Sequence, residues 1–233
     1  MTVTQGRFQG VLFDLFGTVV VPFSMRGHEE GLERIGPVIG LDPDHCNSVW
    51  RSDYEDRVRG RSGAIEDQLQ AMAAAVGSHI AAEPLRQAAI IYRERCDAMM
   101  EPVPTAWETL TALGGRGIPI GLVSNTAPDF AAAFERSGLR RFFASCTFSC
   151  DVGHAKPERE IYRAGADALG MRRDQLLFVG DGSDDELAGA ERAGLKPALV
   201  DSNTIDTYDS KRDAVSNWTG IRFRDLTGAL AWV

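Results

Sequence analysis

The chain is poor in the residues that carry metal–thiolate and nucleophilic chemistry. Its 233 residues include only four cysteines and four histidines. No two cysteines form a CxxC pair, and no histidine has metal-ligand spacing to another histidine or to a cysteine. A zinc site and a Ser/His or Cys/His mechanism therefore have little support, and the cysteines are expected to be buried free thiols.

The chain also lacks an excess of basic residues, a signal segment and a long apolar run. Its net charge is -8 at pH 7, which argues against nucleic-acid and anionic-membrane partners. Residues 1–8 contain no basic segment followed by an apolar core. No apolar stretch approaches the ~18 residues of a membrane-spanning helix. We therefore expect a cytoplasmic protein without nucleic-acid or membrane partners.

One apolar segment, residues 11–20, organises the predicted fold. A run rich in strand formers is typical of a strand buried on both faces, as in a parallel sheet covered by helices. Asp14 would lie at the carboxyl end of this strand, where open α/β sheets bind ligands, and Gly17 permits a sharp turn. Strands alternating with helices predict an α/β fold with a doubly wound parallel sheet. The later strands are expected at 118–125, 142–150, 176–181, 198–201 and near 221.

The composition changes after Pro22. From about residue 26 to residue 100, apolar positions recur at three- and four-residue spacing, which predicts about four helices. Pro102 and Pro104 then stiffen the return to the alternating pattern. We expect a core formed by residues 1–21 and 102–233, with a helical insertion over 22–101 and a surface loop over 202–217.

Polar groups follow three of the predicted strands. Because the ends of parallel strands meet at one edge of a sheet, these groups are expected to converge there. Neighbouring carboxylates repel one another unless a cation joins them, and oxygen ligands favour Mg²⁺. A carboxylate beside Mg²⁺ and a lysine can attack phosphorus and form an aspartyl phosphate, while a hydroxyl and an amide hold the other oxygens. The residues are Asp14, Ser124, Asn125, Lys156, Asp181, Asp184, Asp185 and Glu186.

With these motifs in this order, nearly the whole chain resembles the haloacid dehalogenase-like hydrolase superfamily. Each motif is weak alone, but four on the expected elements are a specific signal. The insertion after the first motif is similar to the helical cap of one subgroup, so the resemblance implies a Rossmann-like core with a cap. The matching segments are Asp14-Leu15-Phe16-Gly17-Thr18, Ser124-Asn125, Lys156-Pro157, and Gly180-Asp181 followed by Asp185.

The resemblance also implies a role for each matching residue. Asp14 would be the nucleophile, assisted by Lys156 and Ser124. Ser124, Asn125, Lys156 and Thr18 would bind the substrate. Mg²⁺ would be held by Asp14, the backbone carbonyl of Phe16, Asp181 and Asp185, although the sequence leaves open which of Asp184, Asp185 and Glu186 contacts the metal. The expected partner is a small-molecule phosphate ester.

One position departs from the phosphatase pattern. Phosphatases of this superfamily usually carry a second aspartate two residues after the nucleophile, as general acid and base, and this chain has Phe16 there. A phenyl ring cannot transfer a proton, and general acid catalysis is typically worth ~10²–10⁴-fold. The insertion could supply another acid, the leaving group could need none, or the protein could be a poor phosphatase.

Three interpretations of the function remain open because Phe16 stands in place of the expected aspartate. We favour a Mg²⁺-dependent phosphatase. A metal-independent 2-haloacid dehalogenase is the first alternative, because expelling halide needs no proton; Phe16 and Tyr162 fit it, but the acidic fourth motif does not. A binding protein with weak or no turnover is the second. Three arginines of the insertion are candidate substrate contacts, although solvated positions explain them more simply: Arg57, Arg59 and Arg61.

Overall fold

The computed structural model describes residues 7–201 and 213–233. Its centre is a six-stranded sheet in the order β3-β2-β1-β4-β5-β6, in which every neighbouring pair is parallel. The prediction of a parallel α/β fold is confirmed. The strands are β1 (Gly10–Phe13), β2 (Ile120–Ser124), β3 (Ser145–Phe148), β4 (Leu176–Gly180), β5 (Lys196–Val200) and β6 (Ile221–Phe223).

Helices cover both faces of the sheet because alternate strand residues point to opposite sides. On β1, Leu12 packs against one layer of helices, whereas Val11 and Phe13 pack into the cluster on the other face. The first layer holds α9 (Arg159–Ala168) and α10 (Glu186–Ala193). The opposite face is covered by α6 (Ala106–Gly115), α7 (Pro128–Arg136) and the 3-10 helix η4 (Leu226–Ala231).

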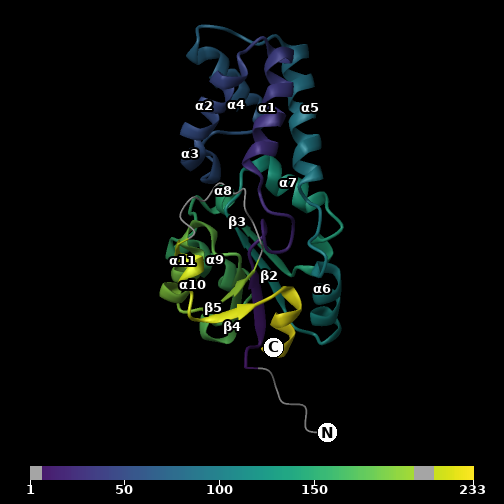
Figure 1. Ribbon diagram of the computed structural model, residues 1–233, viewed down its shortest axis with the longest axis vertical. Helices are drawn as coiled ribbons and strands as arrows, with labels where there is room; N and C mark the ends of the chain where they lie inside the picture. Colours follow the sequence, from purple (N-terminus) through teal and green to yellow (C-terminus); the bar gives the residue numbers. More distant parts are fainter. Residues whose placement is uncertain (1–6, 202–212) are drawn as a thin grey trace.

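The insertion forms a helical bundle at one end of the molecule (Figure 1). It contains five helices rather than the four expected, since a short helix, α3, follows α2 directly. The long helices α1 and α5 pack side by side, and α4 lies against α5. The bundle helices are α1 (Met25–Ile39), α2 (Pro43–Ser52), α3 (Tyr54–Val58), α4 (Ile65–Ala75) and α5 (Ala82–Ala98).

Two local predictions differ from the structure. The third strand ends at Phe148 rather than at residue 150, and Ser149–Val152 forms the short helix α8. Cys150 therefore does not share a strand face with Cys146. All four cysteines are free as expected, but only Cys46 and Cys96 are fully buried, whereas Cys146 and Cys150 are half-buried. Of the expected loop over 202–217, residues 202–212 lie outside the described residues, and Asp213–Ser216 forms the helix α11.

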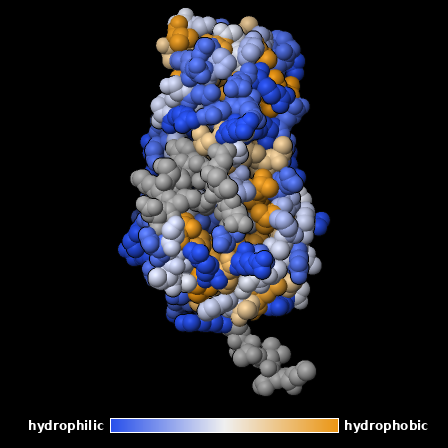
Figure 2. Space-filling model, in the orientation of Figure 1, coloured by the Kyte–Doolittle hydropathy of each residue, from blue (hydrophilic) through white to orange (hydrophobic). Residues whose placement is uncertain are grey.

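The surface of the bundle is largely hydrophilic on the face seen in Figure 2, with a few apolar residues at its outer tip. Among the helices within residues 7–201 and 213–233, none combines the length and the apolar character needed to cross a bilayer.

A buried histidine lies in the first turn of α1. His28 on α1 is 1% exposed, and its ring stacks against Trp50 with the centroids 4.5 Å apart. Neither ring nitrogen has a hydrogen-bond partner among the described residues. Burial lowers the pKa of His28 to about 3, and the charges of Arg95, Arg57 and Arg51 add to this effect. The folded bundle therefore holds a neutral imidazole.

We predict that His28 makes the protein sensitive to mild acid. An unfolded histidine has a pKa of about 6.5. Between that pH and about 3 the unfolded chain binds a proton that the folded chain excludes, so stability falls as the pH falls, by up to about 1.4 kcal/mol per pH unit. His28→Phe, which keeps a stacking ring, should flatten this slope. The urea unfolding midpoints of the parent protein and of His28→Phe, measured between about pH 7 and pH 4, give the two slopes. If the midpoints of both proteins fall equally with pH, the prediction is wrong.

Candidate active site

The carboxyl ends of the central strands bring the motif residues to one edge of the sheet. Asp14 directly follows β1, and its backbone N–H donates to the Val179 carbonyl of β4 at 2.9 Å. Asp181 directly follows β4, and Asn125 directly follows β2. Parallel pairing of three strands therefore gathers residues that lie more than a hundred positions apart in the chain.

The turn after β1 depends on a glycine. Gly17 has a φ of 75°, in the left-handed region that L side chains rarely adopt. A Cβ built there would lie 2.4 Å from Oδ2 of Asp181, which is closer than two such atoms can approach. The absence of a side chain at Gly17 thus lets the loop after β1 and the end of β4 meet.

Four buried ionisable groups meet at this edge. The Lys156 ammonium lies 2.5 Å from Oδ1 of Asp14 and 2.6 Å from Oε2 of Glu186. One carboxylate oxygen from each of Asp14, Asp181 and Glu186 lies within 4.8 Å of the others. None of these four residues is more than 6% exposed. Three carboxylates and one ammonium thus share a space with little water.

The pKa values reflect this crowding. The pKa of Asp14 is raised to about 6: burial is the main cause, Lys156 opposes it, and the Asp181 charge adds to it. Burial also raises the pKa of Glu186 well above its usual value, against the pull of Lys156. Burial alone would lower the pKa of Lys156, but Asp14 and Glu186 hold it well above its usual range. The cluster has more negative than positive charge, which is the donor set that a divalent cation stabilises.

The fourth motif differs from the prediction in one residue. Asp185 does not join the cluster: its side chain is 54% exposed and pairs with Arg192 at 3.7 Å. Glu186 lies there instead, fully buried, and it also accepts a hydrogen bond from the Gly182 N–H at 2.8 Å. A Cβ at Gly180 would lie 2.1 Å from Oε1 of Glu186, so this glycine makes room for the carboxylate.

The groups after β2 are arranged around the loop that carries Lys156. The Asn125 amide accepts from the Lys156 N–H at 2.7 Å and donates to the Lys156 carbonyl at 3.1 Å. Ser124 is fully buried, and its hydroxyl has no hydrogen-bond partner within the described chain. The same holds for the hydroxyl of Thr126, which the sequence reading had missed. Both hydroxyls remain free to meet a ligand oxygen.

Thr18 and Tyr162 act on the site through other residues. The Thr18 hydroxyl is 3.4 Å from Oδ2 of Asp14 and donates to it, which helps to orient the carboxylate. Tyr162 is fully buried, packs on Phe178, and donates its hydroxyl to the Glu186 carbonyl at 2.8 Å. Tyr162 is therefore a core residue that supports α10.

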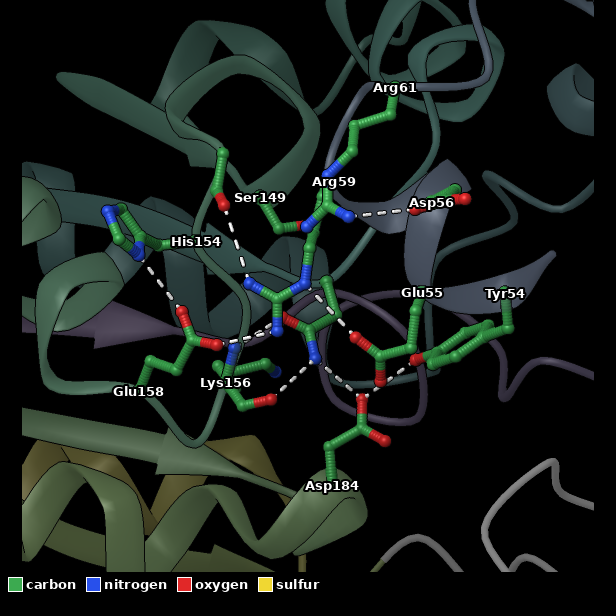
Figure 3. A network of polar contacts seen from close by, with 12 residues as sticks. Tyr54, Glu55, Asp56, Arg59, Arg61, Ser149, His154, Lys156, Glu158 and Asp184 are labelled. Atoms are coloured by element: carbon green, nitrogen blue, oxygen red, sulfur yellow. Dashed lines mark hydrogen bonds and ion pairs between the residues drawn. The ribbon is translucent and has the colours of Figure 1, made fainter.

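Polar contacts hold the helical bundle against the sheet edge (Figure 3). The Tyr54 hydroxyl donates to Oδ2 of Asp184 at 3.1 Å, and that oxygen also accepts from Asn125 at 2.7 Å. The Arg59 guanidinium lies between two carboxylates, Glu158 at 2.5 Å and Glu55 at 3.1 Å. These contacts close the bundle over the charged cluster.

A cavity of about 120 Å³ lies between the bundle and the sheet edge. Asp14, Lys156 and Asp181 line its floor. The wall is mostly apolar and aromatic. It includes Phe16, which the sequence had assigned through its backbone carbonyl, and residues that the sequence had not assigned: Phe23, Trp50, Tyr54 and Phe130.

The three arginines considered as substrate contacts have different environments. Arg57 lines the cavity and is 4% exposed, with its guanidinium carbon 3.7 Å from the centre of the Trp50 ring. The simpler interpretation as a solvated position is therefore wrong for Arg57. It holds for Arg61, which is 61% exposed beside Asp56. Arg59 is a structural link between the bundle and the core.

The match to a protein family agrees with this arrangement. The family model described as haloacid dehalogenase-like hydrolase matches residues 8–194, which include all four motifs. The chain belongs to this family. It is accordingly a hydrolase, and its Rossmann-like core is the fold of solved structures in the same family.

Two relatives match over most of their length. A glyceraldehyde 3-phosphate phosphatase of Methanopyrus kandleri is 26% identical over 88% of this chain and 89% of its own. A ribulose-1,5-bisphosphate 5-phosphatase of Halopiger xanaduensis is 28% identical over 94% and 96%. The chain spans about half the length of several other curated relatives, all named as phosphatases or pyrophosphatases.

A solved dehalogenase shares the fold. The L-2-haloacid dehalogenase from Xanthobacter autotrophicus with chloropropionic acid covalently bound has a TM-score of 0.58, covering 95% of this chain and 96% of its own. Its sequence identity of 18% means that this likeness concerns the fold alone.

Proposed function

We propose that the protein is a Mg²⁺-dependent phosphatase that hydrolyses a small phosphate monoester through an aspartyl phosphate on Asp14. One observation carries the proposal: three buried carboxylates cluster at the carboxyl edge of the sheet beside one ammonium, which pairs with two of them. A metal-independent reaction on a carboxylate substrate would gain nothing from this excess of negative charge. The names of the curated relatives support a phosphatase and do not favour the dehalogenase alternative.

The residues of the cluster fit a hard divalent cation. Asp14, Asp181 and Glu186 would hold Mg²⁺, together with the backbone carbonyl of Phe16 that the family resemblance implies. Oxygen donors of this kind are the ligands that Mg²⁺ prefers. When bound, Mg²⁺ would neutralise charge on the phosphoryl oxygens and on the carboxylates beside them.

Each of the surrounding side chains has a separate role in the reaction. One Asp14 oxygen attacks phosphorus, and the bond between phosphorus and the ester oxygen breaks with its electron pair leaving on that oxygen. Lys156 stabilises the charge on the phosphoryl group as it transfers. The Ser124 and Thr126 hydroxyls are donors for its other oxygens, and the Asn125 amide holds the loop that carries Lys156. Water then attacks the same phosphorus, which releases phosphate and restores the Asp14 carboxylate.

Hydrolysis of phosphoryl compounds with good leaving groups tests this proposal. Acetyl phosphate and 4-nitrophenyl phosphate tolerate a missing general acid, so the protein should release phosphate from both with Mg²⁺ and from neither with EDTA. It should release no halide from 2-chloropropionate. Halide release that persists in EDTA would establish the dehalogenase alternative. If the folded protein turns over neither of the two phosphates nor 2-chloropropionate, the alternative of a binding protein without turnover is supported instead.

Glu186 and Asp185 provide a matched test of the metal ligands. We predict that Glu186→Gln weakens Mg²⁺ binding by at least the roughly 10–100-fold typical of lost groups that support a metal site. Asp185→Asn should change it by less than about twofold, because Asp185 is half exposed and paired with Arg192. Calorimetric titration with Mg²⁺ measures both without relying on turnover. If Asp185→Asn weakens Mg²⁺ binding more than Glu186→Gln does, Asp185 rather than Glu186 is the metal ligand.

A further inference from the structure

The cavity above the charged cluster has the size of a single aromatic ring. Its volume of about 120 Å³ is close to the ~150 Å³ of an engineered apolar cavity that binds benzene. Asp14 lies on its floor, so a phosphoryl group attacked by this carboxylate would have its leaving group inside the cavity. The lining of the cavity therefore selects the leaving group.

Aromatic rings from separate segments form the wall. The Phe16 ring meets Phe130 edge to face at 5.5 Å and Phe23 at 5.8 Å. These residues come from the loop after β1, from α7 and from the segment before α1. The second surface is the planar guanidinium of Arg57, which lies 3.7 Å from the centre of the Trp50 ring that supports it. Flat surfaces of this kind favour an aromatic occupant through stacking and edge-to-face contacts.

The same wall suits a polyol poorly. Each hydroxyl of a sugar or glycerol phosphate would lose water on entry and would need a hydrogen-bond partner, and an apolar wall supplies few. Two of the polar groups that line the cavity are engaged with a third, since Tyr54 and Asn125 both donate to Asp184. A planar apolar leaving group avoids this desolvation penalty.

The chemistry of the floor favours the same class of substrate. Phe16 stands where a general acid would be, and the Lys156 ammonium is held between Asp14 and Glu186. The leaving oxygen must therefore depart without a proton from these groups. A phenol has a pKa of about 10, as in tyrosine, whereas water, which aliphatic alcohols approach, has a pKa of about 15.7. Phenolate thus departs far more readily than an alkoxide.

We propose that the cavity selects phosphate monoesters of aromatic alcohols, an inference that rests on the phosphatase function proposed above. The ring lies between Phe16 and Phe130 on one side and the Trp50–Arg57 stack on the other. Asp14 takes the phosphoryl group, and the bond from phosphorus to the ring oxygen breaks with its electron pair remaining on the phenolate. The phenolate takes a proton from solvent after it leaves.

Two phosphonates separate recognition of the ring from the reactivity of the ester. Phenylphosphonate and methylphosphonate cannot be hydrolysed by this route, so their inhibition constants against acetyl phosphate report binding alone. Phenylphosphonate should bind at least about tenfold more tightly. Among substrates, phenyl phosphate should exceed glycerol 3-phosphate in kcat/KM by about 100-fold or more.

A pair of tryptophan variants locates the effect. In Trp50→Leu the preference for phenylphosphonate over methylphosphonate should shrink at least about threefold. In Trp107→Leu, which changes an exposed residue of α6 that does not line the cavity, the preference should stay. Because both inhibition constants are measured on the same variant, their ratio does not depend on how much of that variant is folded.

The outcomes distinguish this inference from the function on which it rests. If acetyl phosphate is hydrolysed with Mg²⁺ but the two phosphonates bind equally, or glycerol 3-phosphate is the better substrate, the aromatic selection is wrong and the phosphatase remains. If the preference for phenylphosphonate is unchanged in Trp50→Leu, the proposed position of the ring beside Trp50 is also wrong. If acetyl phosphate is not hydrolysed, both proposals fail.

Discussion

Replacing Asp14 with asparagine should abolish turnover. The variant keeps the shape of the side chain but loses the nucleophilic oxygen charge, and removal of the nucleophile from a covalent enzyme can lower kcat by roughly 10⁶-fold. We expect a loss of at least about 10⁴-fold in phosphate release from 4-nitrophenyl phosphate. Lys156 keeps Glu186 as a partner at 2.6 Å, so the buried ammonium is not left unpaired and the fold should persist.

A carboxylate at the opposite edge of the sheet provides the control. Asp174 lies two residues before β4 begins and is 60% exposed beside Arg172, so Asp174→Asn makes the same chemical change away from the site. It should leave turnover within about twofold of the parent. If Asp14→Asn retains a substantial rate while folded, Asp14 is not the nucleophile.

Replacing Phe16 with aspartate should increase turnover of esters with poor leaving groups. A carboxyl group at this position could donate the proton that an alkoxide needs, a contribution typically worth ~10²–10⁴-fold. We expect a gain of about tenfold or more for glycerol 3-phosphate, less than this ceiling because the ring contacts with Phe23 and Phe130 are lost. For 4-nitrophenyl phosphate, which needs no acid, the gain should be small.

The matched variant Phe16→Asn separates proton transfer from the opening of the cavity. Asparagine has nearly the shape of aspartate and cannot act as a general acid. The rate of Phe16→Asp with glycerol 3-phosphate should therefore exceed that of Phe16→Asn, and the excess should decline at high pH as the carboxyl group loses its proton. Equal rates in the two variants would show that a missing acid does not limit this protein.

The sheet and its polar edge could be predicted from the sequence because both depend on short-range patterns. Apolar runs such as 176–180 are buried on both faces, which only strands of a covered parallel sheet allow. Once the strands are parallel, Asp14, Asn125 and Asp181 must share an edge. Four motifs in order then indicated the family, which the family match confirmed.

The choice between Asp185 and Glu186 depended on where a helix begins. Both Asp184 and Asp185 have positive φ values, so the chain turns twice before α10 starts at Glu186. Locating the acidic residue by its place at the start of α10, rather than by its distance from β4, would have identified Glu186 as the buried one. Glu186 lies one turn before the buried Gly189 and Ala190, whereas Asp185 precedes the helix.

The aromatic cavity could not be predicted because its wall comes from three distant segments. Trp50 and Arg57 meet only when α2 and α3 pack over the sheet edge, and Phe130 belongs to a core helix. Nothing in the local sequence distinguishes Arg57 from the solvated Arg61. Long-range packing, rather than periodicity, decides which arginine lines the cavity.

The most direct test of the account is to look for the phosphoryl group on Asp14. The protein is mixed with 4-nitrophenyl phosphate and Mg²⁺, quenched in acid during turnover, and its peptides are examined by mass spectrometry. The account predicts one phosphoryl group on the peptide that contains Asp14, removed by neutral hydroxylamine as expected for an acyl phosphate and absent when Mg²⁺ is replaced by EDTA. A phosphoryl group on a different residue would contradict it.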